Sequence, residues 1–252
     1  MQGTSAFLAV TFLPTIANHS MLDLYRGSVR ISLNPSTLHS HPYTVLTHLF
    51  THESSEHLAL NWSAIVASSL SLNLGFFHSL ALFYGSGIAG LATLILSQNS
   101  LQKTPSIIPQ EIKQFVSTIR SAIPFQITDA IPAEIGNLFT KTYSICGASA
   151  ASFGFIGADF YPLSTEICKI VLSKGKIKKR GQREAKLAGL ILKFVFVTDI
   201  IINQVYHFRN PEAEDIKGYM GWFTKTSKVG YSAHLGGFAF GFIYMLALDI
   251  FA

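Results

Sequence analysis

Two polar residues stand near the start of apolar segments that lie far apart in the sequence. Ser149 is in the middle of a run of small residues, from Ser144 to Gly154, that opens one segment. His234 follows Ala233 at the start of the last apolar segment. A serine hydroxyl and an imidazole act as nucleophile and general base in acyl transfer when they lie within hydrogen-bonding reach. The two residues therefore predict a serine-type catalytic site.

A third apolar segment opens with His57 and Asn61. Residues four apart share one face of a helix. Acyl transfer develops a negatively charged oxygen, and each preorganised donor near it contributes about 3 kcal/mol. We expect His57 and Asn61 to be such donors, and the alternative is that they only form hydrogen bonds between helices.

The same segments also carry residues that favour close helix packing. Small residues repeat every four positions: Ala150, Gly154 and Ala158 in one segment, and Ala233, Gly237 and Gly241 in the other. Such ridges let membrane helices approach closely, so Ser149 by itself fits packing as well as catalysis. An ionisable side chain inside a membrane helix is costly and is functional by default. For His234 we therefore expect a functional role, with a helix cap at the membrane surface as the alternative.

The composition places these segments in a membrane. Hydrophobic residues make up 49% of the 252 residues, charged residues only 13%, and the mean hydropathy is +0.36. A soluble domain carries about 25% charged residues. Several apolar runs approach the roughly 20 residues that span a bilayer as a helix. We expect an all-α, multi-pass integral membrane protein with six transmembrane helices in a bundle, in contact with membrane lipid.

The expected spans cover residues 6–17, 57–74, 76–97, 147–162, 187–206 and 232–252. The first is marginal, because it contains Pro14 and is long enough only if it continues through Met21 and Leu22. A long, mostly polar segment at 98–143 is expected to be a loop between the third and fourth spans.

A basic run from Lys174 to Arg180 sets the expected orientation. Lysine and arginine accumulate in cytoplasmic loops, which explains most of the net charge of +5 without a nucleic-acid partner. Counting alternate crossings from this loop places the starts of the second, fourth and sixth spans together on the opposite face. Those starts carry the four candidate residues: His57, Asn61, Ser149 and His234.

Two patterns for metal and cofactor binding are weaker than they look. His52 and His57 resemble the two zinc ligands of a metalloprotease helix, but they are five residues apart rather than four. That spacing turns the second histidine by about 140° on a helix, and no third ligand is evident. The run Gly85–Gly90 fits the dinucleotide-binding pattern, yet it lies inside an apolar span and indicates helix packing. We expect neither a metal nor a cofactor.

From about Thr47 to the C-terminus the chain resembles the rhomboid intramembrane serine proteases. The resemblance is carried by His52, His57 and Asn61, by Gly147-Ala148-Ser149, and by Ala233-His234-Leu235-Gly236-Gly237 with Gly241. It implies a six-helix core that cleaves transmembrane protein substrates with a Ser–His dyad and no acidic third residue. Ser149 would be the nucleophile and His234 the general base, with His57 and Asn61 at the oxyanion site.

The resemblance also implies supporting residues and a division of the chain. Gly147 and Gly237 belong to the matching motifs, and Phe153 matches an aromatic residue that packs on the catalytic imidazole. Residues 1–46 would hold the marginal first span and a polar first loop, and residues 47–252 the catalytic core. Gly221-Trp222 is closer to the mitochondrial branch, which makes the mitochondrial inner membrane one candidate location and leaves other membranes open.

Three departures from the family pattern bear on activity, and the one at position 150 favours an alternative function that the retained Ser149 and His234 oppose. Ala150 follows the nucleophile where the family has glycine, His41-Pro42-Tyr43-Thr44 stands where a Trp-Arg pair is common, and the region 75–78 lacks an acidic residue. A methyl group at position 150 could tighten the oxyanion site. The alternative is therefore a rhomboid-like pseudoprotease that binds transmembrane clients without cleaving them. A transporter is disfavoured, because the chain shows no clear internal repeat.

Overall fold

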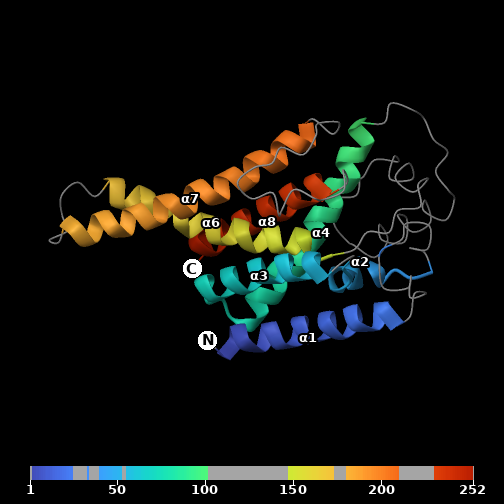
Figure 1. Ribbon diagram of the computed structural model, residues 1–252. Coiled ribbons are helices and arrows are strands. Elements are labelled where there is room, and N and C mark those ends of the chain that lie inside the picture. The colour runs from blue at the N-terminus through green and yellow to red at the C-terminus, as the bar shows by residue number, and fades with distance from the viewer. Residues whose placement is uncertain are drawn as a thin grey trace.

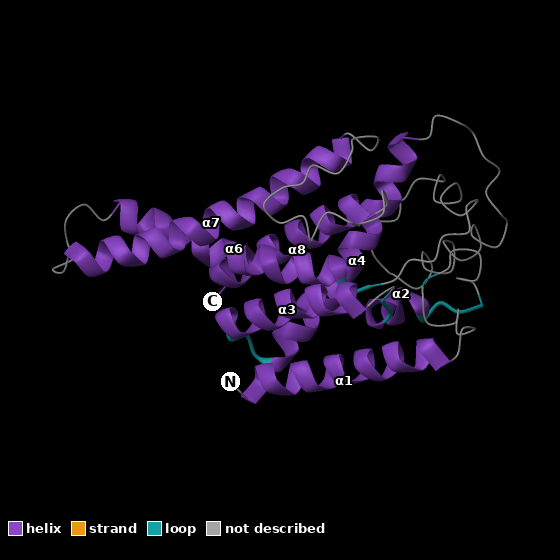
Figure 2. Ribbon diagram, in the orientation of Figure 1, coloured by secondary structure: helices purple, strands orange, loops and turns teal. Residues whose placement is uncertain are grey.

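The computed structural model describes residues 2–24, 33, 40–52, 55–101, 147–172, 180–209 and 230–251. In these residues the regular elements are helices (Figure 2). The all-α class expected from the sequence is therefore confirmed. The basic residues 174–179, the Gly221-Trp222 pair and residues 102–143 of the expected loop lie outside the described residues.

Six of the described helices are long: α1 (Gln2–Leu24), α3 (Ser55–Leu72), α4 (Phe76–Leu101), α6 (Ser149–Leu172), α7 (Arg180–Arg209) and α8 (Gly230–Phe251). Two short elements, α2 (Thr44–Thr47) and the 3-10 helix η2 (His48–Phe50), precede α3. Each expected span overlaps one of the long helices.

The first helix extends further than its apolar run, from Gln2 through Pro14 to Leu24. Proline removes one backbone hydrogen bond from a helix interior. Around it, the hydroxyl of Thr11 donates to the carbonyl of Phe7 and that of Thr15 donates to the carbonyl of Thr11, both at 2.7 Å. These bonds join the turns on either side of the proline.

Three helices of the described part are long and apolar enough to cross a membrane. They cover Phe76–Leu94 of α4, Lys186–Arg209 of α7 and Gly230–Phe251 of α8. The central helix α6 has a polar residue, Asp159, among its buried positions, and most of its first three turns are buried against other helices. A helix that contacts protein rather than lipid does not need an apolar surface all round, so its lower hydropathy follows from its place in the bundle.

The long helices are arranged around α6 and α8 (Figure 1). α7 lies on one side of this central pair, α3 and then α1 lie on the other, and α4 crosses the bundle. The seam between α6 and α8 is made of small residues. A Cβ atom added to Gly241 would lie 1.8 Å from the carbonyl oxygen of Gly154, and one added to Gly237 would lie 2.0 Å from that of Ala150. The ridge on α8 therefore packs backbone to backbone on α6.

The N-terminal helix packs on the same core as the other helices. Phe7 is fully buried, with its ring centroid 5.6 Å from that of Phe155 and 6.0 Å from that of Phe83. The hydroxyl of Thr4 donates to the carbonyl of Leu74 at 3.0 Å. α1 is thus in contact with α4 and α6, while the division of the chain at residue 47 stays a prediction.

An ion pair and a hydrogen bond, both to Asp159, join three helices inside the bundle. The carboxylate of Asp159 on α6 lies 2.6 Å from Lys193 Nζ on α7 and accepts a hydrogen bond of 2.8 Å from the Ser71 hydroxyl on α3. The Asp159 side chain is 12% exposed and that of Lys193 41%. Both carboxylate oxygens therefore have a partner, as a buried charge requires.

We expect Lys193→Met to be more destabilising than the double variant Asp159→Asn/Lys193→Met. The single change leaves a buried carboxylate without its cation, which costs about 1–3 kcal/mol at a partly exposed pair, whereas the double change removes the charge as well. The unfolding midpoints of the wild type and both variants in a denaturing detergent titration measure the difference. Equal midpoints for the two variants would show that the ion pair is dispensable.

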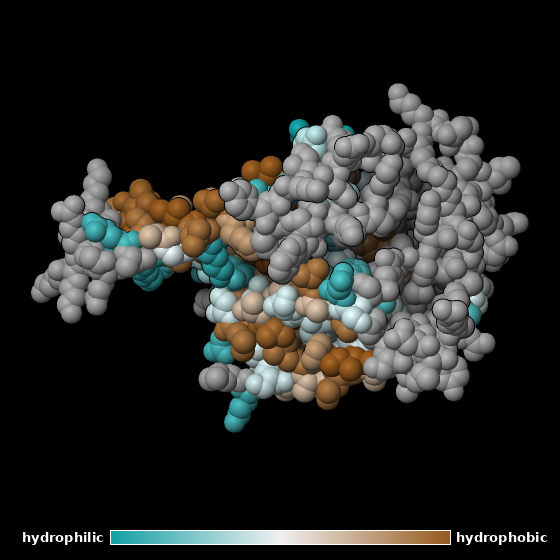
Figure 3. All heavy atoms as spheres, in the orientation of Figure 1, coloured by the Kyte–Doolittle hydropathy of each residue, from teal (hydrophilic) through white to brown (hydrophobic). Residues whose placement is uncertain are grey.

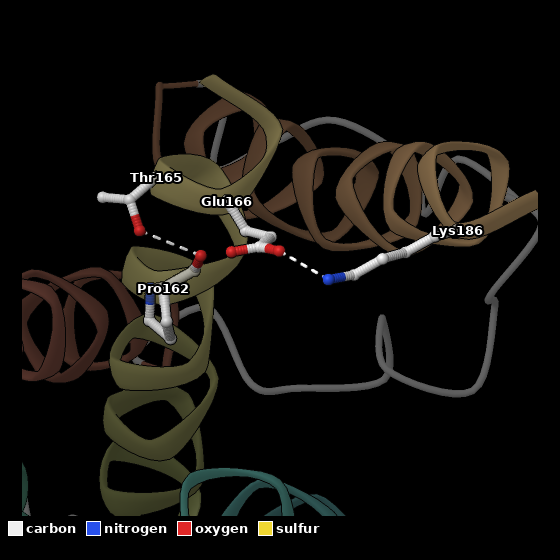
Figure 4. Close-up of polar contacts among 4 residues, drawn as sticks. All are labelled: Pro162, Thr165, Glu166 and Lys186. Atoms are coloured by element: carbon white, nitrogen blue, oxygen red, sulfur yellow. Dashed lines mark hydrogen bonds and ion pairs between the residues drawn. The ribbon is translucent and has the colours of Figure 1, made fainter. Parts of the chain in front are cut away.

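The C-terminal part of α6 and the N-terminal part of α7 project together from the rest of the bundle (Figure 1). Lys186 of α7 and Glu166 of α6 form an ion pair of 2.6 Å between them (Figure 4). The pair is solvent-accessible and contributes little to stability. Apolar side chains gather on this projection, where Val171 is 58%, Leu172 77% and Leu192 73% exposed (Figure 3). Such exposure suits contact with lipid.

Candidate active site

Ser149 is the first residue of α6, and the residues before it are held by the segment that leads into α3. The N–H of Gly147 donates to the carbonyl of His48 at 3.0 Å, and the N–H of Ala148 donates to Nε2 of His52 at 3.3 Å. The side chain of His48 is itself bonded to the Thr44 carbonyl through Nδ1, at 3.1 Å. Burial lowers the pKa of His48 to about 4, so this anchor is uncharged at neutral pH.

Gly147 is required at its position for two reasons. Its φ of +108° is a conformation that side-chain-bearing residues rarely adopt. A Cβ atom there would also lie 2.8 Å from Cε1 of His57. The imidazole of His57 is therefore packed directly on the turn that precedes Ser149.

The imidazole of His234 is held from two directions at the start of α8. Its ring stacks on Phe153 of α6, with a centroid distance of 4.3 Å and an interplanar angle of 3°. Its Nδ1 lies 2.8 Å from Oε1 of Gln204 on α7. The residue is 1% exposed, and its Nε2 makes no hydrogen bond with the described residues. One ring nitrogen is therefore occupied and the other is buried and available.

The starts of α6 and α8 meet over Gly90 of α4. A Cβ atom added to Gly90 would lie 2.5 Å from the Cβ atom of Ala150 and 2.7 Å from the carbonyl oxygen of Ala233. Ala150 and Ala233 are the chain neighbours of Ser149 and His234, so the structure brings these two helix starts together. Nε2 of His234 has no hydrogen-bond partner among the described residues, Ser149 included. Catalytic hydrogen bonds are often long in unliganded enzymes and tighten on substrate binding.

Hydrogen-bond donors lie on two sides of the first turn of α6. Asn61 is 7% exposed and accepts from the Ser152 hydroxyl through Oδ1 at 3.3 Å, and its Nδ2 has no partner among the described residues. The first N–H groups of a helix have no acceptor within the helix, and the helix dipole makes this end positive. The arrangement is suited to stabilise a negatively charged oxygen next to Ser149.

The structure thus gathers the residues expected from the sequence around the start of α6: Ser149, His234, His57, Asn61, Gly147, Phe153 and Gly237. Sequence reasoning missed Gln204, Ser152 and the anchoring role of His48. Gln204 carried a usable signal, because a polar side chain in an apolar span is functional by default. Ser152 and His48 are common residue types that belong to no distinctive sequence pattern.

The two weaker patterns have structural explanations. His52 precedes α3 rather than lying in it, so its ring meets that of His57 edge to face, with centroids 5.3 Å apart. Among the described residues, no three histidine, cysteine, aspartate or glutamate side chains are close enough to hold a metal ion. Gly85 lies inside α4 against the Phe240 ring, and Gly87 lies against Leu49. The interpretation of this run as helix packing is confirmed.

The methyl group of Ala150 faces α4 rather than the oxyanion donors of α3. Its neighbour across the interface is Gly90, which has no side chain and leaves room for it. The departure from the family pattern at position 150 is thus accommodated by a glycine on another helix.

We expect Ala150→Gly to lower stability without raising activity. The change removes a buried methyl and introduces a helical glycine, which together cost about 1–2 kcal/mol. Cleavage of a reporter should stay within about threefold of the wild type, because the methyl lies away from the donors that stabilise the oxyanion. The unfolding midpoint and the cleavage rate of the same preparation measure both effects. A tenfold gain in rate would mean that the methyl obstructs the site.

Comparison with known families gave one family match. A sequence model of the Rhomboid domain matches residues 39–249, which include every candidate residue named above. Searches of curated proteins and of solved structures gave no match. The match covers most of the chain, and together with the apolar helices it identifies an integral membrane protein. The chain therefore belongs to the rhomboid family.

Proposed function

We propose that this protein is an intramembrane serine endopeptidase that cleaves transmembrane substrates near the membrane surface through a dyad of Ser149 and His234. The observation that carries the proposal is the state of His234. Its imidazole is buried and fixed by Phe153 and Gln204, yet Nε2 has no hydrogen-bond partner in the part of the chain that the structure describes. Leaving a buried polar atom unpaired costs about 1–3 kcal/mol, which a reacting group in the site would recover.

The reaction would follow the acyl-transfer sequence. The Ser149 hydroxyl oxygen attacks the carbonyl carbon of the scissile peptide bond while Nε2 of His234 takes its proton. The tetrahedral oxyanion is held by Nδ2 of Asn61, by His57 and by the N–H of Ser149. As the C–N bond breaks, the imidazolium returns the proton to the leaving nitrogen. Water then attacks the ester with His234 again as base, which releases the acid and restores Ser149.

The six long helices are proposed to be the transmembrane bundle in which this occurs. Peptide bonds in a membrane are shielded from water, and a bundle with a polar site at one end can bring serine, base and substrate together near the aqueous phase. The mitochondrial inner membrane, which the sequence resemblance favours, is our candidate location. Fractionation of cells that express the tagged protein tests it.

An activity-based probe tests the proposal directly. A fluorophosphonate should label the wild type and fail to label Ser149→Ala, because the probe requires an activated serine. A panel of transmembrane reporters, incubated with both proteins in the same membrane, should be cleaved only by the wild type. Equal labelling of the two proteins, or equal reporter processing, contradicts the proposal.

A second candidate function is a pseudoprotease that binds transmembrane clients without cleavage, and it is favoured by the absence of a hydrogen bond between Ser149 and Nε2 of His234 in the described residues. Such a protein would retain the fold and the polar end of the bundle without assembling the dyad. Uncleaved clients would then co-purify with the wild type and with Ser149→Ala in equal amount, and the fluorophosphonate would label neither protein.

A further inference from the structure

We propose that Gln204 is a positioning residue that fixes the tautomer and the orientation of the His234 imidazole. The proposal rests on the function proposed above, in which Nε2 of His234 is the basic atom. Gln204 lies on α7, a helix that carries none of the residues expected at the site from the sequence.

The contact between the two side chains determines where the imidazole proton lies. Oε1 of Gln204 is 2.8 Å from Nδ1 of His234, and an amide oxygen only accepts hydrogen bonds. With the amide in this orientation, Nδ1 carries the proton. A neutral imidazole with its proton on Nδ1 has its lone pair on Nε2, and Nε2 is the buried atom that bonds to none of the described residues. Gln204 thus directs the basic nitrogen toward the reaction.

The ring is constrained in two independent ways. Stacking on Phe153 at 4.3 Å fixes the plane of the imidazole but tolerates rotation within that plane and does not distinguish its nitrogens. The hydrogen bond to Gln204 supplies the missing constraint. Because Gln204 is 1% exposed, water does not compete for this bond from an open surface.

An amide suits this location better than a carboxylate. A buried carboxylate would add a charge whose desolvation costs several kcal/mol. The amide oxygen accepts from Nδ1–H in the neutral imidazole and in the imidazolium alike, so the bond persists while Nε2 takes and returns its proton. Gln204 thus acts as an uncharged third residue that supports the Ser149–His234 dyad by accepting a hydrogen bond from His234 Nδ1.

The position of Gln204 depends on how α7 is held. Earlier in the helix, Phe194 stacks on Phe160 of α6 at 5.0 Å, and Lys193 pairs with Asp159 of the same helix. These contacts hold α7 on the helix that carries Ser149. The helix α6 therefore has two roles. It carries Ser149, and by holding α7 in place it also positions Gln204 against His234.

The imidazole tautomer can be observed without catalysis. Nitrogen-15 spectra of the histidine-labelled Ser149→Ala protein in bilayers separate the two tautomers, and the His234 signals are those lost in Ser149→Ala/His234→Asn. We expect the Nδ1–H tautomer, and a mixture or the Nε2–H form in Ser149→Ala/Gln204→Met. A His234 signal of the Nε2–H form without the Met substitution overturns the proposal, as does an Nδ1–H form that the Met substitution leaves unchanged. The Nε2–H result is obtained with Gln204 intact. It would therefore overturn the proposal even if the Gln204→Met variant does not fold.

The kinetic test uses Gln204→Met, which keeps the length of the side chain, and Asn203→Leu as a matched control. Asn203 is the preceding amide on α7 and is bonded only weakly to Asp199 of the same helix, at 3.4 Å. We expect Gln204→Met to lower kcat about 100-fold with KM unchanged, because the imidazole that acts as general base is no longer held in the productive orientation and tautomer, while substrate binding is unaffected. Asn203→Leu should change neither constant. A folded Gln204→Met protein with wild-type kcat refutes a positioning role. One further outcome separates the two proposals. If the fluorophosphonate does not label Ser149 but His234 is in the Nδ1–H form, the proposed protease function fails while the role of Gln204 in orienting the His234 ring stands.

Discussion

Replacement of His234 by asparagine is expected to reduce kcat/KM for reporter cleavage by about 10⁴-fold or more, because the reaction loses its general base. Asparagine is chosen for the structure around the ring. Its amide nitrogen takes approximately the place of Nδ1 and can still donate to Gln204 Oε1, but no atom replaces Nε2. The loss should therefore appear in catalysis more than in folding. Cleavage rate, fluorophosphonate labelling of Ser149 and unfolding midpoint, measured on the same preparation, separate these effects.

His78→Asn is the matched control for this prediction. His78 lies near the start of α4 with its Nδ1 2.8 Å from the hydroxyl of Tyr244. Tyr244 is ten residues beyond His234 on α8, about 15 Å along the helix axis. This substitution removes an imidazole from the same bundle without touching the site, so the rate should stay near that of the wild type. Comparable rates for His234→Asn and the wild type would rule out His234 as the base.

The helices and the convergence of the polar residues could be predicted from the sequence for physical reasons. A bilayer demands apolar runs of fixed length, so α4 and α8 are apparent from composition. The small residues around Gly237 indicated close packing, and the structure shows that α6 is the partner. Because polar residues are expensive inside a membrane, the few at the helix starts were informative, as His234 illustrates.

The contacts that orient the site could not be predicted in this way. The second half of α7 carries several polar residues (Asp199, Asn203, Gln204 and His207), so the sequence does not say that Gln204 is the one that faces α8. The same applies to Gly90. Its missing side chain leaves room for the methyl group of Ala150 only because of the way α4 crosses α6. In each case the deciding contact joins residues on separate helices, and helix crossing angles follow from the whole packed interface.

The seam between α6 and α8 leads to the second large prediction. Gly241→Ala is expected to destabilise the protein by about 2–4 kcal/mol and to reduce kcat/KM by tenfold or more. The added Cβ atom would lie 1.8 Å from the carbonyl oxygen of Gly154 and 3.0 Å from the backbone nitrogen of Ala158. Both are backbone atoms, which cannot rotate away, so the two helices must separate. Gly241 is two turns from His234, and a separation on the order of 1 Å between nucleophile and base costs about 100-fold in rate.

The matched control is Gly189→Ala on α7. A Cβ atom at Gly189 would meet no atom within 4 Å, and alanine favours a helix over glycine by about 1 kcal/mol. This variant should be as stable as the wild type or slightly more stable, with an unchanged cleavage rate. The pair separates the clash at the seam from the general effect of replacing a helical glycine. If Gly241→Ala and Gly189→Ala gave equal midpoints and rates, the α6–α8 contact would not be the element that holds Ser149 and His234 in register.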